Sequence, residues 1–161
     1  MIVNRQRSVP LPMGALENFL RRLRQELRLG DAQVTVCLVS DAEIAGMNEL
    51  FRKKAGPTDV LSFPAGKRQK PLPSNELRTP GHTRLRLRVP MALASGDSLG
   101  DIAIAPAVAR LNAKSYGRTL SIELKILILH GVLHLLGYDH EADRGEMHRA
   151  ERRLRKRLGL A

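Results

Sequence analysis

The chain has 161 residues and carries 27 Lys and Arg against 16 Asp and Glu, which gives a net charge of +11. This length predicts one domain, residues 1–161, whose core needs no disulfide support, and the positive charge favours a polyanionic partner such as nucleic acid. The single cysteine, Cys37, excludes a disulfide framework. Because the chain also lacks a signal-peptide pattern and a membrane-length apolar stretch, we expect a cytoplasmic protein with no membrane partner.

The first part of the chain alternates between strand and helix patterns. Apolar residues recur at helical spacing in residues 13–29, and Gly30 is the expected end of that helix. Ser40 and Glu43 have the spacing of a capping box, which predicts the start of a second helix that carries Arg52. Strands are expected before, between and after these helices, at residues 2–5, 33–39 and 59–63.

Residues 65–98 lack such a regular pattern. This region is basic and is interrupted by Pro and Gly, which are typical of loops. Within it, residues 83–89 alternate like an edge strand or the arm of a hairpin. We therefore expect a basic, irregular insertion at about 65–98.

The last part of the chain returns to regular elements. Thr119 or Ser121 can cap a helix whose long apolar run has few polar positions, so this helix should be central and largely buried. The elements expected here are a strand at 101–105, a helix from Pro106 to Gly117, the apolar helix through 124–136 and a helix at 143–158. The whole pattern predicts a single-domain α+β (mixed α/β) fold, in which helices pack on a small mixed sheet of about four strands.

Three histidines near the end of the apolar helix are the strongest functional signal. His130 and His134 lie one helical turn apart on the same face, where two imidazoles can meet at one ion. Gly137 is expected to end the helix and reverse the chain, which brings His140 back toward the same point. Three protein ligands with an open position are typical of catalytic zinc sites, and hydrolysis is the reaction class that such sites support.

Other interpretations of the histidines remain open at this stage. The pair alone is also compatible with two core histidines satisfied by hydrogen bonds. The remaining histidines, His82 and His148, are expected in a polar loop and on a solvated helix face. Zinc peptidases carry Glu directly after the first histidine, but this chain has Gly131 there, which argues against a peptidase.

Three blocks of the sequence resemble a known family. The histidine block reads His-Gly-x-Leu-His-Leu-x-Gly-Tyr-Asp-His over residues 130–140. Residues 51–64 contain Phe-Arg followed by Pro-Thr-Asp-Val-Leu-Ser-Phe-Pro, and residues 99–102 read Leu-Gly-Asp-Ile. In this order they resemble the YbeY family, metal-dependent endoribonucleases of bacterial ribosomal RNA maturation, and the resemblance covers nearly the whole chain.

The resemblance implies a specific activity. It implies a single-strand-specific endoribonuclease that acts in 16S rRNA 3′-end maturation and ribosome quality control, with one zinc ion held by His130, His134 and His140. It implies the small ribosomal subunit as a partner, and it suggests a ribosome-associated GTPase as another. Arg52 aligns with an arginine that the family marks as functional, and its guanidinium could hold a phosphate during cleavage. From the sequence alone, an exposed helical arginine is the favoured interpretation of Arg52, and it is the resemblance that implies a function for this residue.

The sequence leaves several chemical alternatives open. Zinc, nickel, copper and iron all accept three imidazoles. Either water or a ribose 2′-hydroxyl could attack the phosphorus. Asp59 and Asp101 are expected to be cap or turn partners, and Asp139 is expected to orient a histidine or to shape the turn. The chain could instead act mainly as a ribosome-assembly factor that binds RNA and uses its metal structurally.

Overall fold

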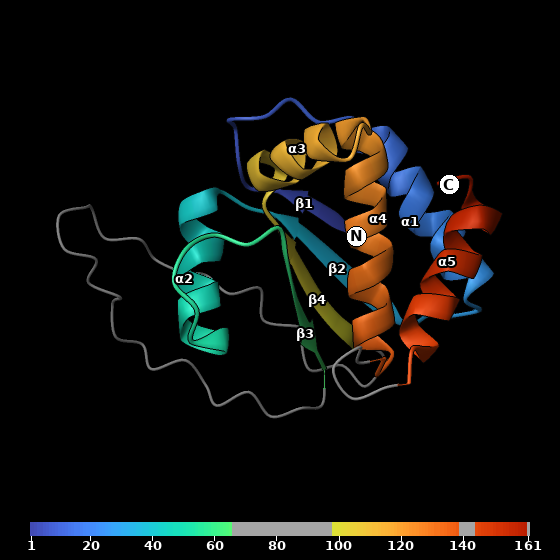
Figure 1. The fold of residues 1–161 in the computed structure, drawn as a ribbon. Helices are drawn as coiled ribbons and strands as arrows, with labels where there is room; N and C mark the ends of the chain where they lie inside the picture. Colours follow the sequence, from blue (N-terminus) through green and yellow to red (C-terminus); the bar gives the residue numbers. More distant parts are fainter. Residues whose placement is uncertain (66–97, 139–143, 161) are drawn as a thin grey trace, which may run out of the picture.

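The computed structural model describes residues 1–65, 98–138 and 144–160. The described residues form a four-stranded sheet in the order β1-β2-β4-β3, together with five helices (Figure 1). The strands are β1 (Ile2–Asn4), β2 (Gln33–Leu38), β3 (Val60–Pro64) and β4 (Ser98–Ile104). The helices are α1 (Met13–Glu26), α2 (Asp41–Arg52), α3 (Pro106–Ser115), α4 (Leu120–Leu135) and α5 (Glu146–Leu158). The α+β prediction with about four strands is therefore confirmed.

The sheet is mixed, and β3 is its antiparallel member. β1 pairs with β2 and β2 pairs with β4 in parallel, whereas β3 runs antiparallel to β4. Alternate residues of each strand face opposite layers, as the two-residue period of a strand requires. In β4, Ile102 and Ile104 face a large core on one side, while Ala103 faces a smaller core on the other.

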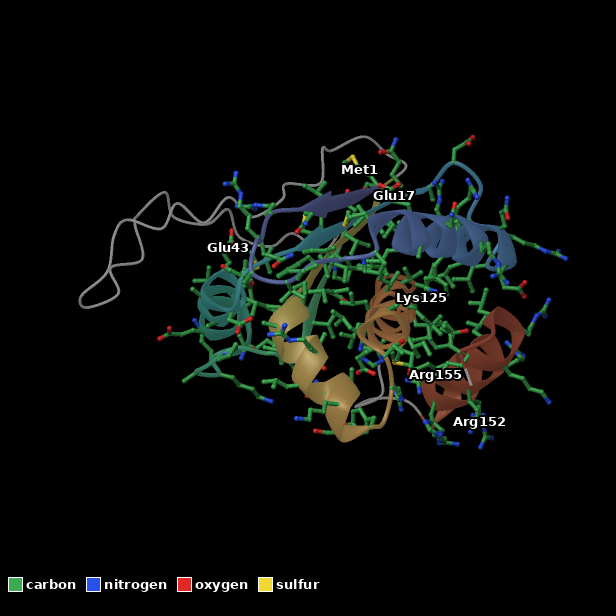
Figure 2. All side chains as sticks on the ribbon, turned by 90° about the horizontal axis from the view of Figure 1, so that it is seen from above. Met1, Glu17, Glu43, Lys125, Arg152 and Arg155 are labelled. Atoms are coloured by element: carbon green, nitrogen blue, oxygen red, sulfur yellow. The ribbon has the colours of Figure 1, made fainter. Side chains whose placement is uncertain are left out.

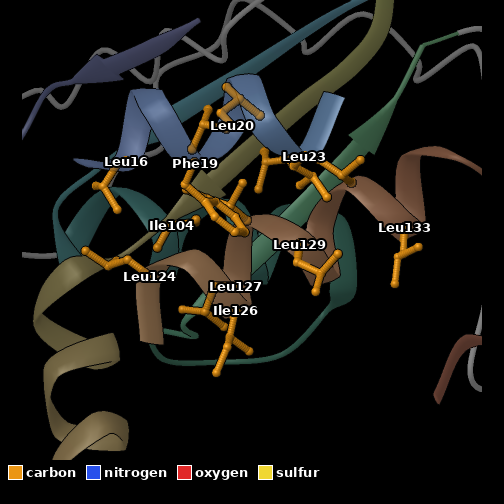
Figure 3. Packing of buried hydrophobic residues seen from close by; sticks show 14 of the residues in the cluster. Leu16, Phe19, Leu20, Leu23, Ile104, Leu124, Ile126, Leu127, Leu129 and Leu133 are labelled. Atoms are coloured by element: carbon orange, nitrogen blue, oxygen red, sulfur yellow. The ribbon is translucent and has the colours of Figure 1, made fainter. Parts of the chain in front are cut away.

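The two cores are covered by different helices. Helices α1, α4 and α5 cover the larger core, where the apolar side chains of α1 interdigitate with those of α4 (Figure 3). Helix α2 covers the smaller core on the opposite face of the sheet (Figure 1). Cys37 of β2 belongs to this smaller core. Burial, and then the nearby charge of Asp101, raise the pKa of the Cys37 thiol to about 11.

Helix α4 is the central element, and its ends are well defined. It is buried on nearly all sides, and the Thr119 hydroxyl accepts a hydrogen bond from the Ile122 N–H at 3.3 Å. At the other end, Gly137 has φ +92, and the N–H groups of Gly137 and Tyr138 donate to the carbonyls of His134 and Leu133. This is the Schellman arrangement, so the predicted glycine stop after the histidines is confirmed.

One predicted helix end is wrong. Gly30 is not the residue that stops α1, because the helix ends at Glu26 and Arg28 already adopts the left-handed conformation, with φ +53. The N–H of Leu29 donates to the Arg24 carbonyl and the N–H of Arg28 to the Gln25 carbonyl, which completes a Schellman motif two residues early. A non-glycine residue in this position is uncommon, and residue type alone does not predict it.

Helix α2 begins as predicted. The capping box of α2 is present, since the Ser40 hydroxyl accepts from the Glu43 N–H and the Glu43 carboxylate accepts from the Ser40 N–H. The predicted insertion, including the strand at 83–89, and the predicted helix start at 143 lie almost entirely outside the described residues. In the part of the chain that is described, no helix is long and apolar enough to cross a membrane.

Candidate metal centre

The rings of His130 and His134 meet edge to face near the C-terminal end of α4. Their centroids are 4.7 Å apart with an interplanar angle of 78°, and the two Nε2 atoms approach to 3.1 Å. A tetrahedral ion with metal–nitrogen bonds of about 2.0–2.1 Å separates two ligand nitrogens by about 3.3 Å. The pair therefore fits two ligands of one zinc-type ion.

The same separation suits one N–H···N hydrogen bond between the rings. Exposure helps to distinguish the two interpretations, because a core histidine would be closed off from solvent. Both rings are instead partly exposed, with 28% of the His130 side chain accessible. An ion or a substrate can thus reach the pair from outside, which favours the metal interpretation over two satisfied core histidines.

The predicted third ligand, His140, and its neighbour Asp139 lie outside the described residues, as does His82. Within residues 1–65, 98–138 and 144–160, no group of three or more His, Cys, Asp or Glu side chains is arranged to hold a metal ion. The described structure thus supplies two converging imidazoles. The three-histidine set remains a prediction for its third member.

Gly131 directly follows His130 in α4 and packs against the sheet. A Cβ atom added to Gly131 would lie 2.8 Å from both Cδ1 and Cγ2 of Ile102, a fully buried residue of β4. Gly131 also accepts a hydrogen bond through its carbonyl from the Ser62 hydroxyl of β3, at 3.5 Å. A peptidase-type glutamate has no room at this position, which is a structural argument against the peptidase alternative.

We expect the Gly131→Ala substitution to destabilise the protein by about 1–2 kcal/mol. Overpacking of this kind costs about 1–3 kcal/mol, and the better helix propensity of Ala, about 1 kcal/mol, offsets only part of it. The Cγ2 atom cannot swing away easily because Ile102 is β-branched. Urea unfolding of Gly131→Ala, Ile102→Ala and the double variant gives a double-mutant cycle. The combined loss should be smaller than the sum of the two single losses, and strict additivity would contradict the predicted contact.

A carboxylate that the sequence analysis did not single out also contacts the histidine pair. Oε2 of Glu151, on α5, lies 3.3 Å from Nδ1 of His130, and Glu151 also forms an ion pair with Arg155. Burial raises the pKa of Glu151, but the hydrogen bond with His130 and the charge of Arg155 outweigh it, so the net pKa lies below its ordinary value. The arginine-rich sequence of α5 predicts a solvated helix, and nothing in that pattern distinguishes Glu151 as a residue that faces α4.

Arg52 is the last residue of α2, and its side chain is exposed. In the described ranges, no hydrogen bond or ion pair joins it to either histidine. Helices α2 and α4, which carry Arg52 and the two histidines, nevertheless both pack against the same strand, β3. Phe51 packs edge-on against Phe63 of β3 at 5.0 Å, and the next residue back along β3, Ser62, bonds to Gly131, beside His130. Figure 1 shows the C-terminal ends of α2 and α4 at the same end of the sheet.

The segment after Arg52 is fixed by structural hydrogen bonds. The Asn48 amide donates to the Gly56 carbonyl at 3.0 Å, which ties the loop back to α2. The Asp59 carboxylate accepts from the Val60 N–H at 2.8 Å and from the Asn112 amide at 3.1 Å, so Asp59 is a turn partner as expected.

The remaining predicted residues occupy separate places. Asp101 is buried in the sheet, in register with Thr35 and Phe63. His148 is exposed on α5, in agreement with a solvated position.

Comparisons with known proteins place this arrangement in a family context. A family model described as Endoribonuclease YbeY matches residues 2–159. Endoribonuclease YbeY of Solibacter usitatus is 42% identical over 146 residues, which cover 91% of this chain and 79% of that protein. Endoribonuclease YbeY of Koribacter versatilis is 38% identical over 160 residues, covering 99% of this chain and 86% of that protein.

A solved structure is similar over nearly the same span. The solution structure of TM1509 from Thermotoga maritima has a TM-score of 0.57 and 29% sequence identity, and the match covers 98% of this chain and 89% of that chain. The likeness extends across the sheet and its helices and is not confined to the histidine segment. The resemblance drawn from the three sequence blocks is therefore confirmed.

Proposed function

Because the chain belongs to the Endoribonuclease YbeY family, we propose that it is an endoribonuclease whose activity depends on a zinc-type ion held by His130, His134 and His140. The observation that carries the metal part of this proposal is the approach of the His130 and His134 Nε2 atoms to 3.1 Å on partly exposed rings. When bound, such an ion supplies a Lewis acid that polarises a phosphate oxygen or lowers the pKa of water.

The proposed substrate is single-stranded ribosomal RNA, with roles in 16S rRNA 3′-end maturation and ribosome quality control. The net charge of +11 supports a polyanionic substrate. Cationic side chains of α1 and α5 project away from the core, with Arg152 on the outer side of α5 (Figure 2). With five aromatic residues in the chain, base stacking contributes little, and recognition depends on phosphates and shape. The small ribosomal subunit, with a ribosome-associated GTPase, is the proposed partner in the cytoplasm.

In this proposal the Arg52 guanidinium binds the phosphate that is cleaved. It would stabilise the negative charge that grows on the phosphate oxygens during the reaction. Support comes from the placement of Arg52 at the end of α2, which shares the edge strand β3 with the histidine helix. The hydrogen bond from Asn48 to the Gly56 carbonyl ties the following loop to α2 and keeps this end of the helix in place.

We expect Arg52→Ala to lower kcat for cleavage of a ribosomal RNA precursor fragment by about 100- to 1,000-fold, the usual effect of removing one charge-stabilising donor. Zinc affinity and the thermal melting temperature should stay unchanged, because Arg52 is exposed and contacts neither histidine. The matched control is Lys54→Ala, which removes an exposed cation two residues away and should retain activity.

The outcome also tests the assembly-factor alternative. Wild-type cleavage that disappears in folded, zinc-loaded Arg52→Ala supports an enzyme with Arg52 in the chemistry. Equal cleavage by the wild type and Arg52→Ala removes Arg52 from the reaction. If the folded, zinc-loaded wild type binds the small subunit but does not cut RNA, the enzyme proposal fails and a binding role with a structural metal replaces it.

A further inference from the structure

Glu151 connects the terminal helix α5 to the histidine pair through a contact with His130. Helix α5 packs on the core through Met147, Ala150, Leu154 and Leu158, and Glu151 lies on the flank of this apolar stripe that faces α4. Its side chain is only 13% exposed, and its Oε2 atom lies 3.3 Å from Nδ1 of His130. The carboxylate is thus held at the ring nitrogen that points away from His134.

Arg155 fixes the other oxygen of the same carboxylate. It lies one helical turn after Glu151, and its guanidinium donates to Oε1. With one oxygen on Arg155 and the other on His130, the carboxylate has little freedom to rotate.

A carboxylate that is paired with a guanidinium, as Glu151 is with Arg155, accepts hydrogen bonds, so Nδ1 of His130 is the donor. This places the ring proton on Nδ1, so that Nε2 of the neutral ring carries its lone pair and no proton. Nε2 is the atom that lies 3.1 Å from Nε2 of His134. The Glu151 contact therefore selects the tautomer of His130 that can bind a metal on the side where the two rings converge.

Two other roles for Glu151 fit the geometry less well. The Glu151 carboxylate contacts Nδ1 of His130, whereas the two rings converge through their Nε2 atoms, so it is poorly placed to be a ligand of the same ion. It also lies across the His130 ring from Nε2, with both oxygens engaged by His130 and Arg155, so it is badly placed to take a proton from an attacking group. The role of Glu151 that fits the geometry is to hold the His130 ring in one orientation and one tautomer.

We propose that Glu151 is a positioning residue, held by Arg155, which fixes the orientation and tautomer of His130 and thereby raises the affinity of the histidine site for its metal. This inference rests on the proposed function, in that it takes His130 and His134 as metal ligands. It adds a residue from α5 that couples the terminal helix to the site.

The first test measures zinc affinity of the full chain by competition with a chelating dye. We expect Glu151→Ala to weaken zinc binding about 10- to 100-fold, the usual effect of removing a hydrogen-bond partner of a metal-binding histidine. Glu151→Gln should lose less zinc affinity than Glu151→Ala, because its amide oxygen can still accept a hydrogen bond from Nδ1–H of His130. The matched control is Glu146→Ala on the same helix, whose exposed carboxylate pairs with Arg149 at 3.7 Å and should not affect zinc binding.

The second test reads the tautomer directly from the ¹⁵N shifts of the His130 ring in metal-free protein. We expect the Nδ1–H form in the wild type and in Glu151→Gln, and a shift toward the Nε2–H form in Glu151→Ala. A loss of packing alone would not change the tautomer in this graded way. Unchanged zinc affinity in both Glu151 variants, or an Nε2–H wild-type ring, would overturn the positioning role.

These results separate this inference from the proposal on which it rests. If the wild type binds zinc, His134→Ala binds it weakly and both Glu151 variants match the wild type, the metal site stands and the role of Glu151 is rejected. If His134→Ala binds zinc as tightly as the wild type, the metal site itself is rejected, and the inference fails with it.

Discussion

Replacing His134 with Ala is expected to lower cleavage of single-stranded ribosomal RNA by at least about 100-fold. The loss should exceed that of an outer hydrogen-bond partner, about 10- to 100-fold, because His134 is a proposed ligand itself. Its Nε2 lies 3.1 Å from Nε2 of His130, and one imidazole cannot hold the ion as the pair would. Zinc content after dialysis should fall together with activity.

The fold should survive this substitution, because the His134 ring is partly exposed and lies outside the apolar core. Far-UV circular dichroism and thermal melting of the metal-free protein check this point. His148→Ala is the matched control, since it removes an exposed imidazole from α5. Wild-type cleavage by folded His134→Ala would contradict the assignment of this residue to the metal site.

Gly100→Ala is expected to produce the largest loss of stability, roughly 3–5 kcal/mol. Gly100 has φ +131, and a Cβ atom there would lie 2.2 Å from the Phe63 carbonyl oxygen and 2.9 Å from the Ala65 nitrogen. Both atoms belong to the backbone at the end of β3 and cannot rotate away. Relief would require β3 and β4 to separate, and β3 also carries the hydroxyl of Ser62 that bonds to Gly131 on the histidine helix.

The effect can be measured by urea unfolding, with Gly14→Ala as the matched control. Gly14 lies in the first turns of α1 with no atom near the added Cβ, so Ala there should stabilise the protein by about 0.4–1 kcal/mol through a less flexible unfolded chain. A free energy of unfolding for Gly100→Ala within about 1 kcal/mol of the wild type would contradict the tight β3–β4 approach.

Much of the fold could be predicted because local signals and the tertiary structure agree. The alternation of Val34, Val36 and Leu38 with Cys37 predicts a strand, and the structure distributes these residues between two cores. The capping box at Ser40 and the glycine stop at Gly137 are short-range hydrogen-bond patterns, so three or four residues suffice to encode them.

The missed features depend on contacts between distant segments. The end of α1 depends on Arg28 adopting a left-handed conformation, which residue type alone does not predict. Glu151 is 21 residues from His130, and its role depends on how α5 docks against α4. The Gly131 contact with Ile102 likewise joins a helix to a strand. The spacing of His130 and His134 was informative because both lie on one helix.

The most direct test of the proposed metal dependence measures RNA cleavage by the full chain as zinc is removed and then returned. Cleavage of a single-stranded ribosomal RNA precursor fragment is measured before chelation, after chelation with metal content verified, and after zinc is restored. We predict that cleavage disappears on chelation and returns with zinc in the wild type, whereas His134→Ala stays inactive throughout. Undiminished cleavage by folded, metal-free protein would contradict a reaction that depends on the histidine site.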